Sequence, residues 1–463
     1  MSWPRGFQLG VATAGFQVEG GFNGPGQPCN NWHRWEAAGR VERSGTAVRF
    51  WDRPEDLLDR AASLGCTSMR LSVEWARCEP AQGAFDVDAF ARYRSILAGC
   101  RAREMRPLVT LHHFTQPRWL GEDFWLDLDS PSRFSRWVAR AVAELGEECE
   151  DWVTVNEPNI YALQTYVTGM FPPGRRLATG FAIRCLDHLV AAHTLAFGAI
   201  KSLQPTSTVA TNTYAFTAYE IDRLLVDLLL APSRGVERRD LHDHLHARRA
   251  EWYAAFPAAT RAERLVRHFT RSAIPLELAF PRTLAAVAGA PERPLDAVQV
   301  DYYDPITSHH LRLPGHRTAG GRNWLPGRML WDDVVDAAGL RRYCRAAAEP
   351  GLPLQIVENG LCNRVTTAAS HPRADGWTRP AYLERNLAAV RDLVASGTDV
   401  SGYWHWTLAD NYEWGSYEPR FGIFGVDRSD PGRPRILDVD SMGDDSAAAF
   451  RSAAGAEISP PGA

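Results

Sequence analysis

Short apolar runs alternate with amphipathic stretches through most of the chain. The apolar runs predict buried strands at 7–12, 67–75, 106–114, 154–158, 207–214, 295–305, 354–360 and 399–414. The spacing of apolar residues between them predicts helices at 52–65, 86–104, 130–149, 180–203, 331–349 and 378–396. Eight strands in regular alternation with helices predict an α/β chain that folds as a single (β/α)₈ TIM barrel with long loops.

Two stretches depart from this alternation. Residues 216–294 are helical in pattern and charged, with runs such as RGVERRD and HARRAE that are typical of solvated faces. We interpret them as a helical insertion after the fifth strand, lying over the barrel mouth. The end of the chain, from about 450 to 463, is rich in Pro, Gly and Ala and predicts a tail. Residues 1–463 are therefore expected to form one domain.

Two of the predicted strands end in a glutamate. The run TVNEP at 154–158 delivers Glu157, and LQIVENG at 354–360 delivers Glu358. Each triplet alone is common in turns after strands, but the carboxyl ends of all strands of a (β/α)₈ barrel meet at one face. The two carboxylates are thus expected to face each other, which is the arrangement that cleavage of a glycosidic bond requires.

Polar residues inside apolar strands add to this predicted site. Arg70 lies within TSMRLSVEW, where a buried guanidinium is costly unless it meets a carboxylate; the alternative is a surface arginine on a half-exposed strand. His112 and His113 end the third strand. Because no third ligand pattern lies near them, a sugar hydroxyl or the packed core is favoured over a metal ion as their partner.

Composition and charge exclude several classes of partner. The chain is 45% hydrophobic and 23% charged with a net charge of −4, so it has no basic excess that would attract nucleic acid or an anionic membrane. The longest apolar stretch, near 189–200, contains His193 and is too short to span a membrane. The 16 tryptophans suit stacking on sugar rings, although most are expected in the core.

The cysteines and the amino terminus point to the compartment. The eight cysteines are scattered without a C-x-x-C pair, which predicts buried free thiols rather than disulfides or a zinc site. The start MSWPRGFQLG has no charged leader followed by an apolar core, so the protein is expected to be cytoplasmic. No metal and no cofactor is implied, and the oligomeric state stays open.

Eight segments resemble glycoside hydrolase family 1, the β-glucosidase and β-galactosidase family, in the order in which that family carries them. They are FQLGVATAGFQVEG, RLSVEWARCEP, TLHHFTQPRWL, TVNEP, YVTGMFPPG, DYY, IVENG and YWHWTLADNYEWG, and they extend across nearly the whole chain. The resemblance implies a retaining exo-β-glycosidase that acts on a small-molecule β-glycoside without a cofactor.

The resemblance also implies roles for individual residues. Glu157 would be the acid/base and Glu358 the nucleophile, with Arg70 and Tyr303 as hydrogen-bonding partners of the nucleophile. Asn156 would bind the sugar 2-hydroxyl. The residues implied at the glycone position are Gln17, His113, Trp406, Glu413 and Trp414. Asn212 is implied beside the acid/base, where it would orient that residue. Trp324 is implied at the aglycone position. Trp406 would be the stacking floor, and Glu413 would hold the 4- and 6-hydroxyls.

The chain departs from the family pattern at two pocket positions. Asp301 stands before Tyr302 and Tyr303 where the family commonly has Asn, so a potential negative charge lies near the nucleophile and is expected to raise a local pKa. Phe114 follows His113 in place of the more usual Trp, which removes an indole N–H while keeping an aromatic wall.

The sequence distinguishes between several activities within and beyond the family. Glu413 stands where a sugar phosphate would sit, which favours an unphosphorylated sugar, and Glu rather than Gln at 157 favours O-glycosides over thioglycosides. A transglycosidase that hands the sugar to a small-molecule acceptor would use the same residues. A sugar-binding barrel without catalysis is disfavoured, because binding alone has no need of two mutually repelling carboxylates. The glycone, among gluco, galacto, fuco and manno, stays open.

Overall fold

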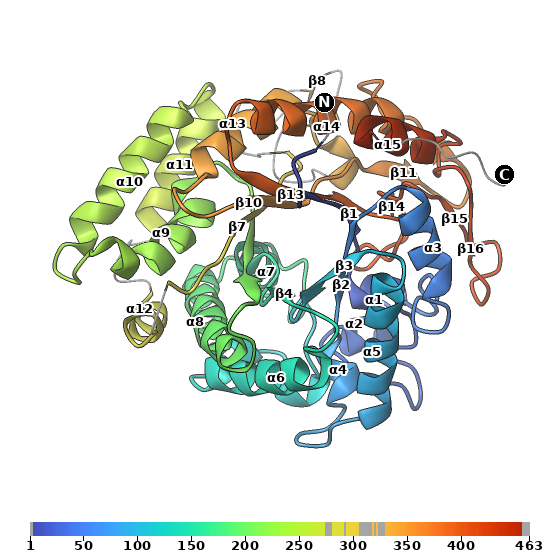
Figure 1. The fold of residues 1–463 in the computed structure, drawn as a ribbon, viewed down its shortest axis with the longest axis horizontal. Coiled ribbons are helices and arrows are strands. Elements are labelled where there is room, and N and C mark those ends of the chain that lie inside the picture. Colours follow the sequence, from blue (N-terminus) through green and yellow to red (C-terminus); the bar gives the residue numbers. More distant parts are fainter. Residues whose placement is uncertain are drawn as a thin grey trace.

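A parallel barrel forms the centre of the molecule in the computed structural model, which describes residues 3–273, 280–290, 293–304, 317–318, 321–322 and 329–455. Its strands are β1 (Gln8–Ala12), β2 (Ser68–Ser72), β3 (Arg106–Thr110), β4 (Asp151–Val153), β5 (Thr208–Ala210), β6 (Asn212–Tyr214), β7 (Val298–Asp301), β10 (Leu354–Glu358) and β13 (Val400–Trp406). They pair in the order β5-β4-β3-β2-β1-β13-β10-β7-β6 (Figure 1).

The nine strands occupy eight positions, because β5 and β6 are two halves of the fifth predicted strand. The chain leaves the ladder at Thr211, β5 pairs with β4, and β6 pairs with β7. One interrupted strand therefore joins both ends of the sheet order, and the predicted (β/α)₈ barrel is confirmed.

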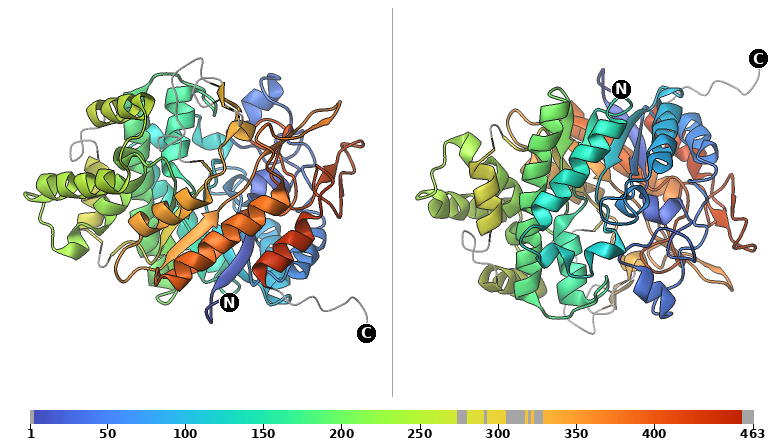
Figure 2. Two further views of the ribbon diagram at one scale, coloured as in Figure 1. Left: turned by 90° about the horizontal axis from the view of Figure 1, so that it is seen from above. Right: turned by 90° about the horizontal axis from the view of Figure 1, so that it is seen from below.

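Helices surround this sheet on the outside, as Figures 1 and 2 show. The long ones at predicted positions are α3 (Glu55–Ser63), α5 (Val87–Arg101), α6 (Ser130–Leu145), α8 (Thr179–Leu203), α13 (Ala337–Ala347) and α14 (Arg379–Ala395). Short ones are α1 (Gly15–Val18), α2 (His33–Ala37), α4 (Trp75–Cys78) and α7 (Pro158–Leu163). Their starts follow from the sequence: the Asp86 side chain accepts hydrogen bonds from the first turn of α5, and Thr378 does so for α14.

Short antiparallel strands lie in the loops between the main elements. They are β8 (Arg317–Thr318), β9 (Gly321–Arg322), β11 (Asn363–Val365), β12 (Ser370–His371), β14 (Pro419–Arg420), β15 (Val426–Asp427) and β16 (Arg435–Ile436). The strand predicted at 399–414 ends earlier, since β13 stops at Trp406 and the remaining residues form a loop.

Helix α8 is long and apolar enough to pass as a membrane span by length and composition. It is nevertheless mostly buried in the protein, where it packs against α6 and against α12 (Pro281–Ala288). Its His193 makes hydrogen bonds with the Thr154 hydroxyl at 2.6 Å and with the Pro294 carbonyl at 2.7 Å. These contacts explain α8 as a core helix of the barrel.

The helical segment after β6 lies at the flank of the barrel and not across its mouth. It contains α9 (Leu224–Leu230), α10 (Leu241–Ala255), α11 (Arg261–Ala273) and α12, and in all three ribbon views α9 to α11 extend to one side, next to α13. The helical pattern was predicted correctly, whereas the placement over the mouth is wrong for these described helices.

Buried ion pairs explain that placement. Asp227 on α9 accepts from Arg223 at 3.1 Å and from Arg248 at 3.2 Å, and Arg248 also bonds to Glu349, which follows α13, at 2.8 Å. These pairs fasten α9 and α10 to the outside of the barrel. The expectation that the HARRAE run is a solvated face is therefore wrong for Arg248, and also for Arg249, which is buried beside Glu220.

The end of the chain is more ordered than its composition predicts. Helix α15 (Ser446–Ala454) packs against α14 and buries Phe450, and the Trp3 indole donates to the Ala454 carbonyl at 2.8 Å. The predicted tail from about residue 450 is therefore wrong for residues 450–454, which are helical, and residues 456–463 lie outside the described residues. Phe450 is the apolar residue that indicates a packed helix in a segment whose overall composition is typical of a tail.

Below the strand ends, a tryptophan fills the barrel interior. Trp404 is fully buried, and its indole N–H donates to the Ser68 hydroxyl at 3.0 Å. Gly10 on β1 makes room for it: a Cβ at this position would lie 2.4 Å from the Ser68 carbonyl oxygen and 2.7 Å from the indole ring. The glycine is thus required by close packing and not by its backbone angles.

Gly10→Ala is expected to destabilise the protein by about 2 kcal/mol, because the added methyl group overpacks the barrel interior. The matched control is Gly198→Ala on α8, where a Cβ meets nothing within 4 Å and alanine is the better helix former. Urea unfolding of both variants checks the prediction. Equal stability of the two variants would contradict it.

Candidate active site

Glu358, the last residue of β10, is held from two sides. Arg70 on β2 donates from Nη1 to Oε1 at 2.5 Å, and the Tyr303 hydroxyl donates to Oε2 at 2.8 Å. Arg70 is completely buried, and its Nε is held by the Thr110 hydroxyl at 3.2 Å. The costly buried arginine predicted from the sequence therefore meets a carboxylate, and the surface alternative is wrong.

Glu157 lies in the same pocket as Glu358, but its backbone is left-handed and not part of a strand. Strand β4 ends at Val153, so Glu157 lies beyond the strand and directly before α7, with a left-handed φ of 38°. This conformation costs a residue with a side chain on the order of 1 kcal/mol. The Glu157 carbonyl accepts the Tyr161 N–H at 3.0 Å, and Pro158 fits the first turn of α7, so helix formation holds the strained residue in place.

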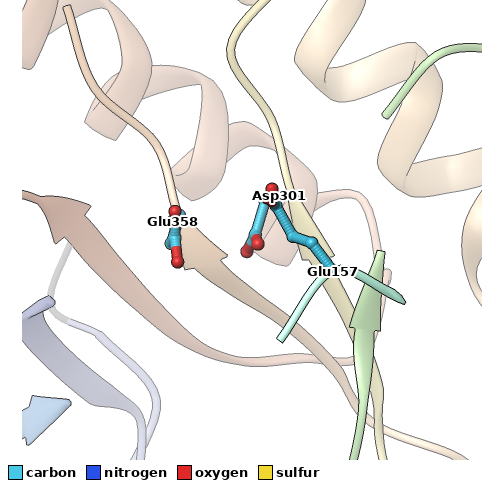
Figure 3. A group of neighbouring side chains, drawn as sticks. All are labelled: Glu157, Asp301 and Glu358. Carbon is cyan, nitrogen blue, oxygen red and sulfur yellow. The ribbon is translucent and has the colours of Figure 1, made fainter. Parts of the chain in front are cut away.

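Three carboxyl groups converge in this space. Glu157, Asp301 at the end of β7, and Glu358 each place an oxygen within 4.8 Å of the other two (Figure 3). Retaining glycosidases hold their two carboxyl groups about 5 to 5.5 Å apart, whereas inverting ones need about 6.5 to 9.5 Å to admit a water. The separation of Glu157 and Glu358 therefore matches the retaining geometry.

The same three carboxylates could hold a metal ion by distance alone. The Arg70 guanidinium already supplies a positive charge at Glu358, however, and bonds to both Glu358 and Asn156. We assign no ion to this position, and the expectation of a metal-free site stays a prediction.

The environment separates the two glutamates in acidity. Burial raises the pKa of Glu358, but the Arg70 charge and the Tyr303 hydrogen bond act against that rise. Burial raises the pKa of Glu157 well above its usual value, and the nearby charges of Asp301 and Glu358 raise it further. Glu157 is therefore the group that keeps a proton, and Glu358 is the better anion.

A hydrogen-bonded row of amides lines the floor beside these carboxylates. Asn156 accepts from Arg70 and, at 2.9 Å, from Asn212 on β6, which also donates to Asp301. Asn212 was predicted to orient the acid/base, but its hydrogen bonds go to Asn156 and Asp301 instead. The Asn156 Nδ2 is buried and lacks a hydrogen-bond partner among the described residues, so one donor is left for a ligand.

Glu413 and Gln17 form the far side of the pocket. The Gln17 amide donates to Glu413 Oε2 at 3.0 Å. Burial and the negative charge of Glu358 raise the pKa of Glu413 to about 8, although hydrogen bonds from Gln17 and Trp406 act in the opposite direction. Gln17 was predicted from a strand end and Glu413 from the loop after the eighth strand, and the structure brings the two together.

Aromatic rings form the wall and floor. His113 stacks on Trp406 and on Trp414, with ring centroids 5.7 Å apart in both pairs, and its Nε2 lies 4.0 Å from Glu358 Oε1. Burial and the Arg70 charge hold the pKa of His113 well below its usual value, so the ring is neutral. Phe114 packs edge-on against Trp414 with centroids 5.0 Å apart, which keeps the wall aromatic. Trp324, the predicted aglycone residue, lies outside the described residues.

Two contributors were missed in the sequence. Thr110, which holds Arg70, ends β3 just before the two histidines that drew attention. Tyr214 at the end of β6 stacks on Tyr303 with centroids 5.6 Å apart and an interplanar angle of 11°. Their position at the carboxyl ends of strands was the available signal, since the carboxyl end of every strand of the barrel faces the pocket.

A family model described as glycosyl hydrolase family 1 matches residues 1–265 and 294–441. The chain belongs to this family. It is therefore a glycoside hydrolase, and the family works with retention of configuration at the anomeric carbon, in agreement with the spacing of Glu157 and Glu358.

Relatives named for different activities align over nearly the whole chain. A β-galactosidase from Sulfolobus acidocaldarius is 27% identical, with 92% of this chain and 91% of that protein covered. A 6-phospho-β-galactosidase from Lacticaseibacillus casei is also 27% identical, with 92% and 94% covered, and β-glucosidase 47 from Arabidopsis thaliana is 25% identical, with 94% and 83% covered. The family thus fixes the reaction class and leaves the sugar open.

Solved structures of similar fold cover the chain from end to end. A β-glucosidase from Thermotoga maritima, determined in complex with castanospermine, has a TM-score of 0.73 at 21% identity over 99% of this chain and 100% of that one. An enzyme from Alicyclobacillus herbarius has a TM-score of 0.74 at 21% identity, with 99% of each chain covered. At this identity the likeness concerns the fold.

The raised pKa of Glu413 predicts a pH-dependent stability. Its folded-state pKa of about 8 exceeds the usual value near 4.5, so the folded protein binds this proton more tightly and loses stability as the pH rises from about 4.5 to 8. Glu413→Gln keeps an oxygen that accepts from Gln17 and removes the carboxyl group that binds the proton. We expect the variant to gain about 1 to 3 kcal/mol over the unsubstituted protein between pH 5 and pH 8, since Glu413 is only partly buried and solvent screens part of the effect.

Urea unfolding of both proteins at pH 5 and pH 8 and constant ionic strength measures this difference. Other buried carboxyl groups are present in both proteins, so their contribution cancels. A stability difference that does not change with pH would show that Glu413 titrates normally.

Proposed function

We propose that this chain is an exo-β-glycosidase that hydrolyses unphosphorylated O-linked β-glycosides by double displacement. The observation that carries the proposal is the unequal support of two closely spaced carboxyl groups: Arg70 and Tyr303 bond to Glu358, whereas no described cation is hydrogen-bonded to Glu157. One carboxyl group is thereby suited to attack and the other to give a proton.

In the first step, a Glu358 oxygen forms a bond to the anomeric carbon while the bond from that carbon to the aglycone oxygen breaks. Glu157 transfers its proton to the departing oxygen. The resulting glycosyl ester removes the negative charge of Glu358, which eliminates one of the causes that raise the pKa of Glu157. Glu157 is then able to act as a base.

In the second step, Glu157 takes a proton from water as the water oxygen bonds to the anomeric carbon. The ester bond breaks, and the electron pair returns to Glu358, where Arg70 and Tyr303 stabilise the carboxylate. Two displacements at one carbon restore its original configuration. Asn156, with its spare amide donor, is placed to bind the 2-hydroxyl of the sugar during both steps.

The pocket chemistry supports an unphosphorylated sugar. Glu413 with Gln17 offers a carboxyl and an amide to hydroxyl groups, while a phosphate dianion at this place would be repelled by Glu413 and Glu358. Trp406, buried against His113, is proposed as the floor on which the ring stacks. The eight free cysteines, seven of them buried, support a reducing and therefore cytoplasmic location.

Removing each glutamate in turn distinguishes their roles. In Glu358→Ala we expect hydrolysis to fall by at least about 10⁴-fold, and added azide should attack the opposite face and give an α-glycosyl azide from an activated aryl β-glycoside. In Glu157→Ala we expect a loss of about 10² to 10⁴-fold on poor leaving groups and formation of a β-glycosyl azide. Product configuration by NMR is the measurement.

Glu148→Ala, near the opposite end of β4, serves as the control and should retain normal rates. Azide products of the same configuration from both glutamate variants would refute the assignment of nucleophile and acid/base.

A panel of aryl β-glycosides that differ at C2, C4 and C6, with the 6-phosphates included, identifies the glycone. We expect one unphosphorylated sugar to be preferred and 6-phosphates to be poor substrates. In Glu413→Ala, kcat/KM for the preferred sugar should fall about 10-fold or more, and discrimination at C4 and C6 should shrink to within a few-fold, because the hydrogen bonds that distinguish these hydroxyls are lost.

The same panel tests hydrolysis against transfer. Release of free sugar in water, in step with release of the aryl group, is the expected result. Aryl release that requires an added acceptor, with glycosylated acceptor as the product, would identify a transglycosidase instead.

A further inference from the structure

Asp301 is a third carboxyl group inside the catalytic pocket. It is completely buried at the end of β7, and one of its oxygens lies within 4.8 Å of both Glu157 and Glu358 (Figure 3). Its Oδ2 accepts a hydrogen bond from Asn212. Among the described residues no cation forms an ion pair with Asp301, and a carboxylate buried beside two others is expensive, so its presence calls for a physical explanation.

Two buried oxygens at this position lack an N–H or O–H donor. They are Glu157 Oε1 and Asp301 Oδ1, which have no such partner among the described residues. Because an oxygen of each carboxyl group lies within 4.8 Å of one on the other, a hydrogen bond between the two groups would satisfy both, and it can form only when one group carries a proton. The pair therefore shares a single proton, as neighbouring carboxyl groups do when both cannot ionise cheaply.

The surroundings decide which partner keeps that proton. The Asn212 amide donates to Asp301, which favours the ionised form of Asp301, and the Arg70 charge acts in the same direction. No amide of the described segments donates to Glu157, and the charges of Asp301 and Glu358 both favour its protonated form. The proton therefore resides on Glu157, and Asp301 accepts the hydrogen bond.

The other charged and titratable groups that face the pair do not change this order. Tyr303 donates to Glu358 and stays a neutral phenol, because burial raises its pKa. His113 is neutral, and Glu413 is hydrogen-bonded to Gln17 and is not among the charges that shift the pKa of Glu157 or Asp301. Asp301 is thus the negative group in direct contact with the acid/base.

We propose that Asp301 is a positioning residue that accepts a hydrogen bond from the Glu157 carboxyl, keeps that carboxyl protonated before the sugar leaves, and makes Glu157 a stronger base when water attacks. The inference rests on the proposed role of Glu157 as acid/base. It assigns a function to a carboxylate at a position where an amide would give the opposite effect, since an amide N–H would donate to Glu157 and favour its ionised form.

The decisive variant is Asp301→Asn, which has the same shape and keeps an oxygen for Asn212. Loss of the negative charge lowers the pKa of Glu157. The basic limb of the kcat/KM profile, which reports the protonated acid, should move to lower pH by about one unit or more for a substrate with a poor leaving group. For a dinitrophenyl glycoside, which needs no acid, kcat/KM at neutral pH should change much less.

A uniform loss of rate with an unmoved basic limb would overturn the proposal and show that Asp301 only supports the fold. The background Glu157→Ala keeps the two proposals apart. If Glu157 is not the acid/base, this background retains the basic limb and the proposed function fails. If Glu157 is the acid/base, the basic limb is lost in this background, and adding Asp301→Asn should not change the pH profile further.

A spectroscopic measurement on the unsubstituted protein does not depend on the folding of Asp301→Asn. The infrared difference between the protein and Glu157→Gln at neutral pH should contain a protonated-carboxyl band. The absence of this band would mean that Glu157 is ionised beside Asp301, which contradicts the shared proton.

Discussion

The ion pair between Arg70 and Glu358 is the interaction on which the pocket depends. In the described part of the pocket, Arg70 is the cation that acts on Glu157, Asp301 and Glu358, and Glu413 is a fourth carboxyl group near Glu358. A buried pocket cannot hold four ionised carboxylates against one cation, so protons must neutralise some of them. Because Arg70 bonds to Glu358, that carboxylate ionises first and the remaining groups hold or share protons.

A second cluster of charges in the same molecule shows what a balanced network looks like. On the flank, Asp227 and Glu349 meet Arg223, Arg234 and Arg248, and the pKa of Asp227 is lowered by the surrounding arginines despite its burial. In this network each carboxylate is paired with arginines, and the ion pairs fasten helices to the barrel. The excess of carboxyl groups over cations in the pocket is therefore typical of a catalytic site, whereas the ion pairs on the flank hold the structure together.

The barrel makes this imbalance tolerable. Side chains from several parallel strands meet where the strands end, and some of them adopt strained backbone there: Glu157, Phe114 and Trp414 have φ angles of 38°, 63° and 44°. Residues in this region of backbone space persist only when the surrounding structure holds them. The buried sheet below, filled by Trp404 and similar side chains, supplies that support and leaves the pocket free to hold unfavourable charges.

The sequence by itself determined the barrel and the two glutamates, because strand patterns are local and each ends in its carboxylate within a few residues. It also indicated Arg70, since one charge inside an apolar strand is a local anomaly. Only the tertiary structure decided that the segment after β6 covers the flank, because its ion pairs join residues more than one hundred positions apart. For the same reason only the fold could show that Asp301 lies against Glu157, which converts a single-residue departure into a shared proton.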